Sequence, residues 1–348
     1  MGYQLSKSGA DAIFRRLAQD YDILAPKCMV GEGCFSDTDV IRYGRVDSFD
    51  EIEWEKKSDY SFKEVLLPVN ETLFYFTEDQ TTVPSEEEKE ILVFLRACDL
   101  HAVKRLDEIY LNNVFGDYYY ERRRSKVKFI LMGCSVSCDR GFCVSMGTNK
   151  AENYDAYLKV DGDMVYADIK DDSLLHTVKD LYRSVKETET AVQGTVIHKK
   201  EKTPDYVTEN NEKVTLPKNL SNDSFTKEIW KEYGDRCITC GRCNFACPTC
   251  TCFTMQDIFY QDNPKVGERR RIWASCQVDG YTDMAGGHGF RKDKADRMRF
   301  KIMHKIYDFE KRFGYPMCVG CGRCDDICPE YISYANIVNK LAKEEEEA

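Results

Sequence analysis

The sequence lacks the motifs of the commonest nucleotide-dependent and hydrolytic enzymes. No G-x-G-x-x-G turn joins a strand to a helix, and no phosphate-binding loop of the form G-x-x-x-x-G-K-[ST] occurs. An H-E-x-x-H zinc signature is also missing, and no Ser/His/Asp set stands out. These absences predict a chain that binds no flavin or NAD itself and has no hydrolytic centre.

Long apolar runs and an excess of positive charge are lacking as well. No stretch reaches the ~18–20 apolar residues that a membrane span needs, and the N-terminus has no apolar secretion-signal core. The 50 Lys and Arg residues stand against 60 Asp and Glu residues, a formal net charge of −10, which argues against general binding to nucleic acid or anionic lipid. We expect a cytoplasmic protein with no membrane span, whose partners are other proteins.

Cysteine, by contrast, is abundant. Seventeen cysteines occur in 348 residues, a chain long enough for two domains. A reducing cytosol keeps ordinary thiols free, so dense cysteine clusters in such a protein usually bind metal or carry redox chemistry. The arrangement of the cysteines therefore decides the interpretation.

The first domain, residues 1–222, has the pattern of an α/β domain. Apolar runs at 91–98 and 127–134 have the length of buried strands, and each ends in a cysteine. A helical stripe between them begins after Asp99, a good helix N-cap, so the three segments form a βαβ unit with parallel strands. Cys98 and Cys134 are then expected at the carboxyl ends of the sheet, where open α/β sheets bind ligands.

Three further segments complete this domain. The apolar spacing behind Ser8 predicts a short N-terminal helix, and a second stripe predicts a helix over 173–186. Residues 187–224 are rich in charge, Thr and Asn, which is typical of a surface hairpin and linker. The domain boundary is placed at 222.

The second domain, residues 223–348, contains two matched cysteine runs. CITCGRCNFACP (237–248) and CVGCGRCDDICP (318–329) agree at seven positions with an offset of 81 residues. Each has the form C-x2-C-x2-C-x3-C-P, the bacterial ferredoxin run, in which the fourth cysteine binds the other cluster. The predicted [4Fe–4S] ligands are Cys237, Cys240, Cys243 and Cys328 for one cluster, and Cys318, Cys321, Cys324 and Cys247 for the other.

Two features bear on this second domain. Helical stripes between and after the runs predict a mainly helical fold. A zinc site needs only two separated C-x2-C pairs, so the third and fourth cysteines of each run disfavour a zinc-binding adaptor.

A third group of cysteines is less complete in sequence. Cys134, Cys138 and Cys143 lie within ten residues, and Cys98 joins them if the βαβ unit forms. Free cysteine is also commonly buried as a small apolar side chain, so spacing alone leaves a third cluster and ordinary thiols equally open. The other cysteines have no complete ligand set and are expected to be ordinary buried thiols or neighbours of ligands: Cys28, Cys34, Cys250, Cys252 and Cys276.

Several segments resemble the iron–sulfur electron-transfer component of the anaerobic, assimilatory-type sulfite reductase. They are ILVFLRACDLHAVKRLD, GCSVSCDRGFC, CITCGRCNFACPTCTCF, WASCQVDGYTDMAGGHGFR and CVGCGRCDDICPE, and the resemblance covers nearly the whole chain. The chain is also similar, more distantly, to the beta subunit of cytosolic nickel–iron sulfhydrogenases. Cysteine spacing alone does not separate these two families.

The resemblance implies a third [4Fe–4S] cluster on Cys98, Cys134, Cys138 and Cys143, and an α-helical ferredoxin fold for the second domain. It also implies a non-catalytic electron-transfer subunit. Electrons would pass from a flavin subunit that oxidises NAD(P)H, through this chain, to a siroheme subunit that reduces sulfite to sulfide. The alternatives are the iron–sulfur beta subunit of a sulfhydrogenase and a self-sufficient iron–sulfur flavin reductase.

Overall fold

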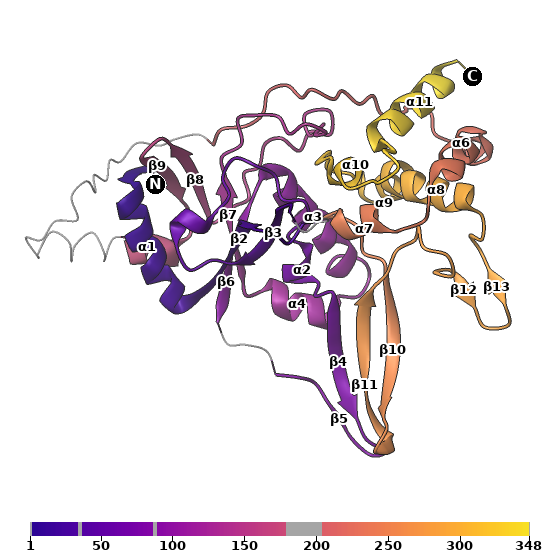
Figure 1. The fold of residues 1–348 in the computed structure, drawn as a ribbon, viewed down its shortest axis with the longest axis horizontal. Coiled ribbons are helices and arrows are strands. Elements are labelled where there is room, and N and C mark those ends of the chain that lie inside the picture. The colour runs from indigo at the N-terminus through magenta and orange to yellow at the C-terminus, as the bar shows by residue number, and fades with distance from the viewer. Residues whose placement is uncertain (1, 34–36, 86–88, 179–203, 348) are drawn as a thin grey trace, which may run out of the picture.

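A computed structural model describes residues 2–33, 37–85, 89–178 and 204–347. Figure 1 shows a sheet-containing N-terminal part, a group of helices formed by the C-terminal part, and a long β-arm that projects away from both. The C-terminal helices lie beside the end of the sheet at which α3 begins.

A seven-stranded sheet forms the centre of the N-terminal part, with β2, β6, β7 and β8 mutually parallel and both edges antiparallel. In spatial order the strands are β1 (Gly2–Ser6), β9 (Met164–Ile169), β8 (Ala156–Asp161), β7 (Val127–Met132), β6 (Glu90–Leu95), β2 (Tyr21–Met29) and β3 (Val40–Arg45). The last four residues of β6 and of β7 are all buried, as expected for central parallel strands covered on both faces.

The predicted βαβ unit is confirmed. β6 and β7 pair in parallel, and α3 (Ala97–Tyr110) connects them. Cys98 lies in the first turn of α3 and Cys134 lies two residues beyond β7, so both cysteines lie at the carboxyl ends of the strands.

Two helix starts differ from the prediction. α1 (Lys7–Asp20) is capped by Ser6, whose hydroxyl accepts a hydrogen bond from the Gly9 N–H, and not by Ser8. α3 begins after Arg96, so Asp99 lies inside its first turn instead of capping it. The carboxylate of Asp99 instead forms a buried ion pair with Arg323. An aspartate can serve either as a helix N-cap or as a partner in a buried ion pair, and only the tertiary contact with Arg323 shows which role Asp99 has.

The remaining helices of the N-terminal part are short. They are the 3-10 helix Phe49–Glu51, α2 (Lys63–Leu66) and α4 (Tyr118–Arg124). Of the helix predicted over 173–186, residues 173–178 are helical, and 179–186 lie outside the described residues. Of the predicted hairpin and linker over 187–224, residues 187–203 also lie outside them, and residues 204–221 contain no strand, so the described part is linker without a hairpin.

The C-terminal part contains the helices that the sequence predicts between and after the two cysteine runs, together with further short helices before and within the runs. They are the 3-10 helix Asn222–Thr226, α6 (Ile229–Arg236), α7 (Arg242–Ala246), α8 (Lys294–Met303), α9 (Phe309–Phe313), α10 (Arg323–Asp326) and α11 (Tyr334–Glu346). A π-helical turn, His304–Asp308, joins α8 to α9. α6, α8 and α11 share an apolar core that also touches Cys237, Cys318, Cys324 and Cys328.

The structure also contains a β-arm, which the prediction of a mainly helical second domain does not include. β10 (Phe253–Tyr260) and β11 (Asn263–Trp273) form an antiparallel hairpin, and β11 also pairs with β4 (Asn70–Phe76), which pairs with β5 (Thr81–Thr82). One sheet thus combines strands from both sides of residue 222. A smaller hairpin joins β12 (Asp283–Met284) to β13 (His288–Gly289). Among the described residues, no helix has the length and apolar character needed to cross a membrane.

Candidate iron–sulfur sites

The two cysteine runs fold into loops of the same conformation. The residue after the second cysteine of each run is a glycine with a left-handed backbone that starts the following short helix, Gly241 with φ 76° and Gly322 with φ 74°. Thr239 and Gly320, two positions earlier, also have positive φ angles. The backbone N–H of each of these two residues donates a hydrogen bond of 3.4 Å to the sulfur of the first cysteine of its run.

The second run lines a cavity together with the last cysteine of the first run. We call this group, Cys247, Cys318, Cys321 and Cys324, the middle site. These four are the crossed ligand set that the ferredoxin pattern predicts. Cys243 and Cys250 also line this cavity.

The four cysteines of the third group line a second cavity. We call Cys98, Cys134, Cys138 and Cys143 the strand-end site. Arg96 and Asn210 contribute polar side chains to the same wall, and the Asn210 amide donates to the Cys143 sulfur at 3.6 Å. The described residues of the N-terminal part therefore bring together the set that spacing alone left open.

The remaining predicted ligands form what we call the outer site, Cys237, Cys240, Cys243 and Cys328. Burial raises the pKa of Cys237, and the nearby sulfurs of Cys243 and Cys240 raise it further. Cys237 and Cys328 pack against the same apolar core, and the Ile332 N–H donates to the Cys328 sulfur at 3.4 Å. Cys240 is exposed, so this site lies at the surface.

Buried cations surround the cysteine sulfurs. Lys305 is 4% exposed; its ammonium lies 3.5 Å from the Cys247 sulfur and donates to the Thr249 hydroxyl at 2.8 Å. It makes no ion pair with a carboxylate in the part of the chain that the structure describes. Burial alone would lower the pKa of Lys305, but the sulfurs of Cys247 and Cys250 raise it above its ordinary value.

Two more buried cations repeat this arrangement. Lys301, one helical turn before Lys305, lies near the Cys243 sulfur, and Arg96 lies near the Cys134 sulfur; each sulfur raises the pKa of the neighbouring cation. An uncompensated buried lysine is costly, whereas thiolates bound to iron supply the missing negative charge. The donor set and its surroundings therefore fit anionic iron–sulfur clusters.

These cations were not recognised from sequence. Lys301 and Lys305 lie on the same face of a helical stretch, four residues apart, beside the apolar positions Ile302 and Ile306. In the sequence, the only indication of these buried cations is a pair of lysines beside an apolar helical stripe between the two cysteine runs.

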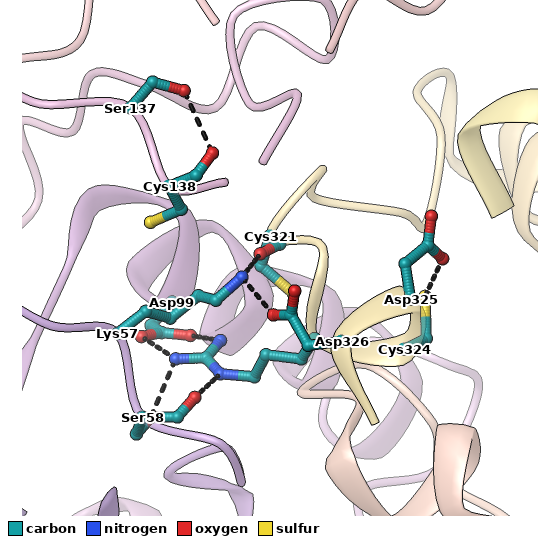
Figure 2. A network of polar contacts seen from close by, with 10 residues as sticks. Lys57, Ser58, Asp99, Ser137, Cys138, Cys321, Cys324, Asp325 and Asp326 are labelled. Atoms are coloured by element: carbon teal, nitrogen blue, oxygen red, sulfur yellow. Dashed lines mark hydrogen bonds and ion pairs between the residues drawn. The ribbon is translucent and has the colours of Figure 1, made fainter. Parts of the chain in front are cut away.

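A network of polar contacts joins the middle site to the strand-end site. The Arg323 guanidinium binds both carboxylate oxygens of Asp99, at 2.6 and 3.0 Å, and also binds Ser58. Figure 2 shows Asp99 and Ser58 beside Lys57, which donates to the Cys321 carbonyl at 2.7 Å and pairs with Asp326. Arg323 follows Cys321 by two residues and Asp99 follows Cys98, so the network fixes ligand loops of two different sites against each other.

The cysteines outside the predicted ligand sets differ in their surroundings. Cys28 is exposed, and Cys34 lies outside the described residues. Cys250 is buried next to Cys247, which raises the pKa of the Cys250 thiol. Cys252 and Cys276 lie next to each other and shift each other's pKa, a pairing that their spacing in the sequence does not indicate.

The described cysteines are not arranged for a single metal ion. Among these residues, no three His, Cys, Asp or Glu side chains converge closely enough to hold one. A zinc ion draws its sulfur ligands to about 2.3 Å, whereas a four-iron cluster places its thiolates at the corners of a larger group.

Comparisons with known proteins agree with these sites. Residues 236–332 match the family of 4Fe-4S dicluster domains, so the chain contains a domain of that class. Over 313 residues the chain is 29% identical to sulfhydrogenase 2 subunit beta of Pyrococcus furiosus. This match covers 86% of this chain and 88% of that protein. No solved structure matches the chain. The protein is therefore an iron–sulfur electron-transfer protein related to a sulfhydrogenase beta subunit.

Proposed function

We propose that this chain is the iron–sulfur subunit of a multi-subunit oxidoreductase of the sulfhydrogenase type, and that it holds three [4Fe–4S] clusters. Bound at the three sites, such clusters would take up and release single electrons. The observation that carries the proposal is the sharing of walls between sites. Cys321 lines both the strand-end cavity and the middle cavity, and Cys243 of the outer site also lines the middle cavity.

The shared walls support one order of sites, from strand-end to middle to outer. The two end sites have exposed apolar residues beside their ligands. Val136, between Cys134 and Cys138, is 77% exposed, whereas Ile238 is 53% and Tyr331 is 85% exposed next to the outer-site cysteines. Such isolated apolar contacts at the two ends are suited to two different partner subunits. The middle site, enclosed between them, would hand electrons on inside the chain.

Iron content tests the number of sites. Anaerobically prepared chain should contain about 12 irons, and Cys138→Ala should lose about four because it removes a strand-end ligand. Cys28→Ala, which removes an exposed cysteine outside all three sites, is the matched control and should lose none. Zinc in place of iron after anaerobic expression would overturn the proposal.

The partners distinguish the sulfhydrogenase-type complex from the sulfite reductase. The relative over most of the chain is the beta subunit of a sulfhydrogenase, which supports the first. The second, with its flavin and siroheme subunits, rests only on the sequence resemblance. Purifying the complex through a tag on this chain and measuring nickel and siroheme separates them: nickel supports the sulfhydrogenase type, and siroheme supports sulfite reduction.

A self-sufficient flavin reductase remains the third hypothesis. Flavin absorbance retained by the isolated chain, together with sulfite reduction without partners, would support it against both complexes.

A further inference from the structure

Cys252 and Cys276 form a thiol pair that none of the three cluster sites uses. Cys252 lies next to the Cys276 thiol, the Cys276 backbone N–H and the Tyr281 hydroxyl, all of which favour its thiolate form. The Cys276 sulfur in turn accepts from the Asn244 amide at 3.0 Å and the Gln277 amide at 3.7 Å. These two amide donors hold the Cys276 sulfur in place next to Cys252.

The surrounding backbone keeps these two cysteines close together. Phe253 pairs with Trp273 at the end of the β10–β11 hairpin, and the Ala274 N–H donates to the Cys252 carbonyl at 2.9 Å. Cys276 begins the turn directly after this hairpin. The hairpin therefore hydrogen-bonds Cys252 to the backbone two residues before Cys276, which gives the proximity in the fold that a disulfide between them requires.

The two thiols differ in accessibility. Cys276 is buried, whereas Cys252 is partly exposed, so a small molecule in solution reaches Cys252 first. The pKa of Cys252 is lowered to about 6, chiefly because the neighbouring Cys276 thiol favours its thiolate form. An accessible thiolate beside a buried second thiol is the usual arrangement of an attacking and a resolving cysteine.

We propose that Cys252 and Cys276 are a thiol–disulfide exchange site, at which Cys252 attacks small-molecule disulfides and Cys276 resolves the product. The Cys252 thiolate bonds to one sulfur of the small disulfide, whose S–S bond breaks and releases a small thiolate. That thiolate takes the Cys276 proton, and the Cys276 sulfur then attacks Cys252 and expels the second small thiolate. The protein pair loses two electrons and gains an S–S bond, and the small disulfide gains the two electrons.

The site is connected to the outer site through one side chain. Asn244 contacts the Cys276 sulfur and also lies 3.5 Å from the sulfur of the preceding residue, Cys243. The state of the thiol pair therefore acts on the hydrogen bonding next to an outer-site ligand. The exchange itself requires no cluster, so the proposal does not depend on the proposed function.

The test uses the full chain, prepared anaerobically and equilibrated with mixtures of reduced and oxidised glutathione. After acid quenching and alkylation, mass spectrometry measures the peptide linked through Cys252 and Cys276, while iron is measured in parallel. The linked peptide should rise and fall reversibly with the glutathione ratio at constant iron content. Its absence at every ratio, or its appearance only as iron is lost, would overturn the proposal.

Two variants separate the roles of the cysteines. In Cys276→Ser, the mixed disulfide between glutathione and Cys252 should accumulate at least tenfold over the level in the unchanged chain, because the resolving thiol is gone. In Cys252→Ser, the buried Cys276 should form no mixed disulfide above the level of exposed Cys28. Equal amounts of mixed disulfide in the two variants would contradict the assigned roles. If a variant misfolds, the linked-peptide assay on the unchanged chain still decides the proposal.

Discussion

The two cysteine runs share one loop conformation but have opposite surroundings. The arginine that follows the left-handed glycine of each run shows the contrast: Arg323 of the second run is 1% exposed and paired with Asp99, whereas Arg242 of the first run is exposed. The second run is enclosed by the N-terminal part, with Gly322 pressed against the Arg140 carbonyl. The same motif therefore serves one anchored site inside the molecule and one site at its surface.

The strongest test of this contrast removes each arginine. Arg323→Met should lower the free energy of unfolding by about 3–5 kcal/mol, because Asp99 would keep a buried charge without its partner. Arg242→Met, an exposed position, should change it by less than about 0.5 kcal/mol. Anaerobic denaturant unfolding measures both.

A double variant checks the cause of the Arg323 effect. Arg323→Met with Asp99→Asn removes both charges and should recover part of the lost stability. Equal losses from Arg323→Met and Arg242→Met would contradict the difference between the two runs.

The glycines provide a second, smaller contrast. A Cβ atom on Gly322 would lie 2.2 Å from the Arg140 carbonyl oxygen, whereas one on Gly241 would lie 3.0 Å from the Ser275 and Val278 side chains. Both positions have positive φ, which costs a non-glycine residue about 1–2 kcal/mol. Gly322→Ala should add a backbone clash and destabilise by roughly 3 kcal/mol, against about 1–2 for Gly241→Ala. Thermal unfolding of the two variants that shows the reverse order would refute this packing argument.

The charge of Lys305 should tune the middle site. A positive charge roughly 7 Å from the centre of a cluster, at an effective dielectric constant of about 20, stabilises the added electron of the reduced cluster by about 2.4 kcal/mol. This corresponds to about 100 mV in a one-electron reduction potential. Lys305→Met should therefore make one cluster potential more negative by about 100 mV, measured by redox titration followed by electron paramagnetic resonance. Lys294→Met removes an exposed lysine from the same helical stretch and should shift no potential by more than about 20 mV.

The smallest effect on stability is expected at the exposed residues beside the outer site. Ile238→Ser and Tyr331→Ser should each change the free energy of unfolding by less than about 0.5 kcal/mol, since both side chains are largely in solvent. Under the proposed function they should weaken binding of the partner protein that docks on this end, measured by co-purification. Val136→Ser is the control at the opposite end and should leave that partner bound.

Several features were predictable from sequence because they depend on local pattern. The buried strands that became β6 and β7, their parallel pairing and the helix between them follow from short apolar runs and the rule for βαβ connections. The repeated loop follows from seven matched positions in the two runs. The ligand assignments at the three sites stay predictions, although the cavities now bring together the strand-end and the middle sets.

Other features depended on contacts between segments far apart in the chain. The role of Asp99 was misread because its partner, Arg323, is 224 residues away. The β-arm was missed because β11 pairs with β4 across 200 residues, where no local pattern records the partner.

By itself, the sequence determined that the chain holds iron–sulfur clusters, since the ligand spacing within each run is short enough for the backbone to set it. Tertiary structure alone decided which run is enclosed and which faces outward, because burial depends on what packs against a loop. It also decided that Cys321 lines two cavities and that Cys252 meets Cys276. Those contacts arise only when the N-terminal sheet and the C-terminal helices close around the same cysteines.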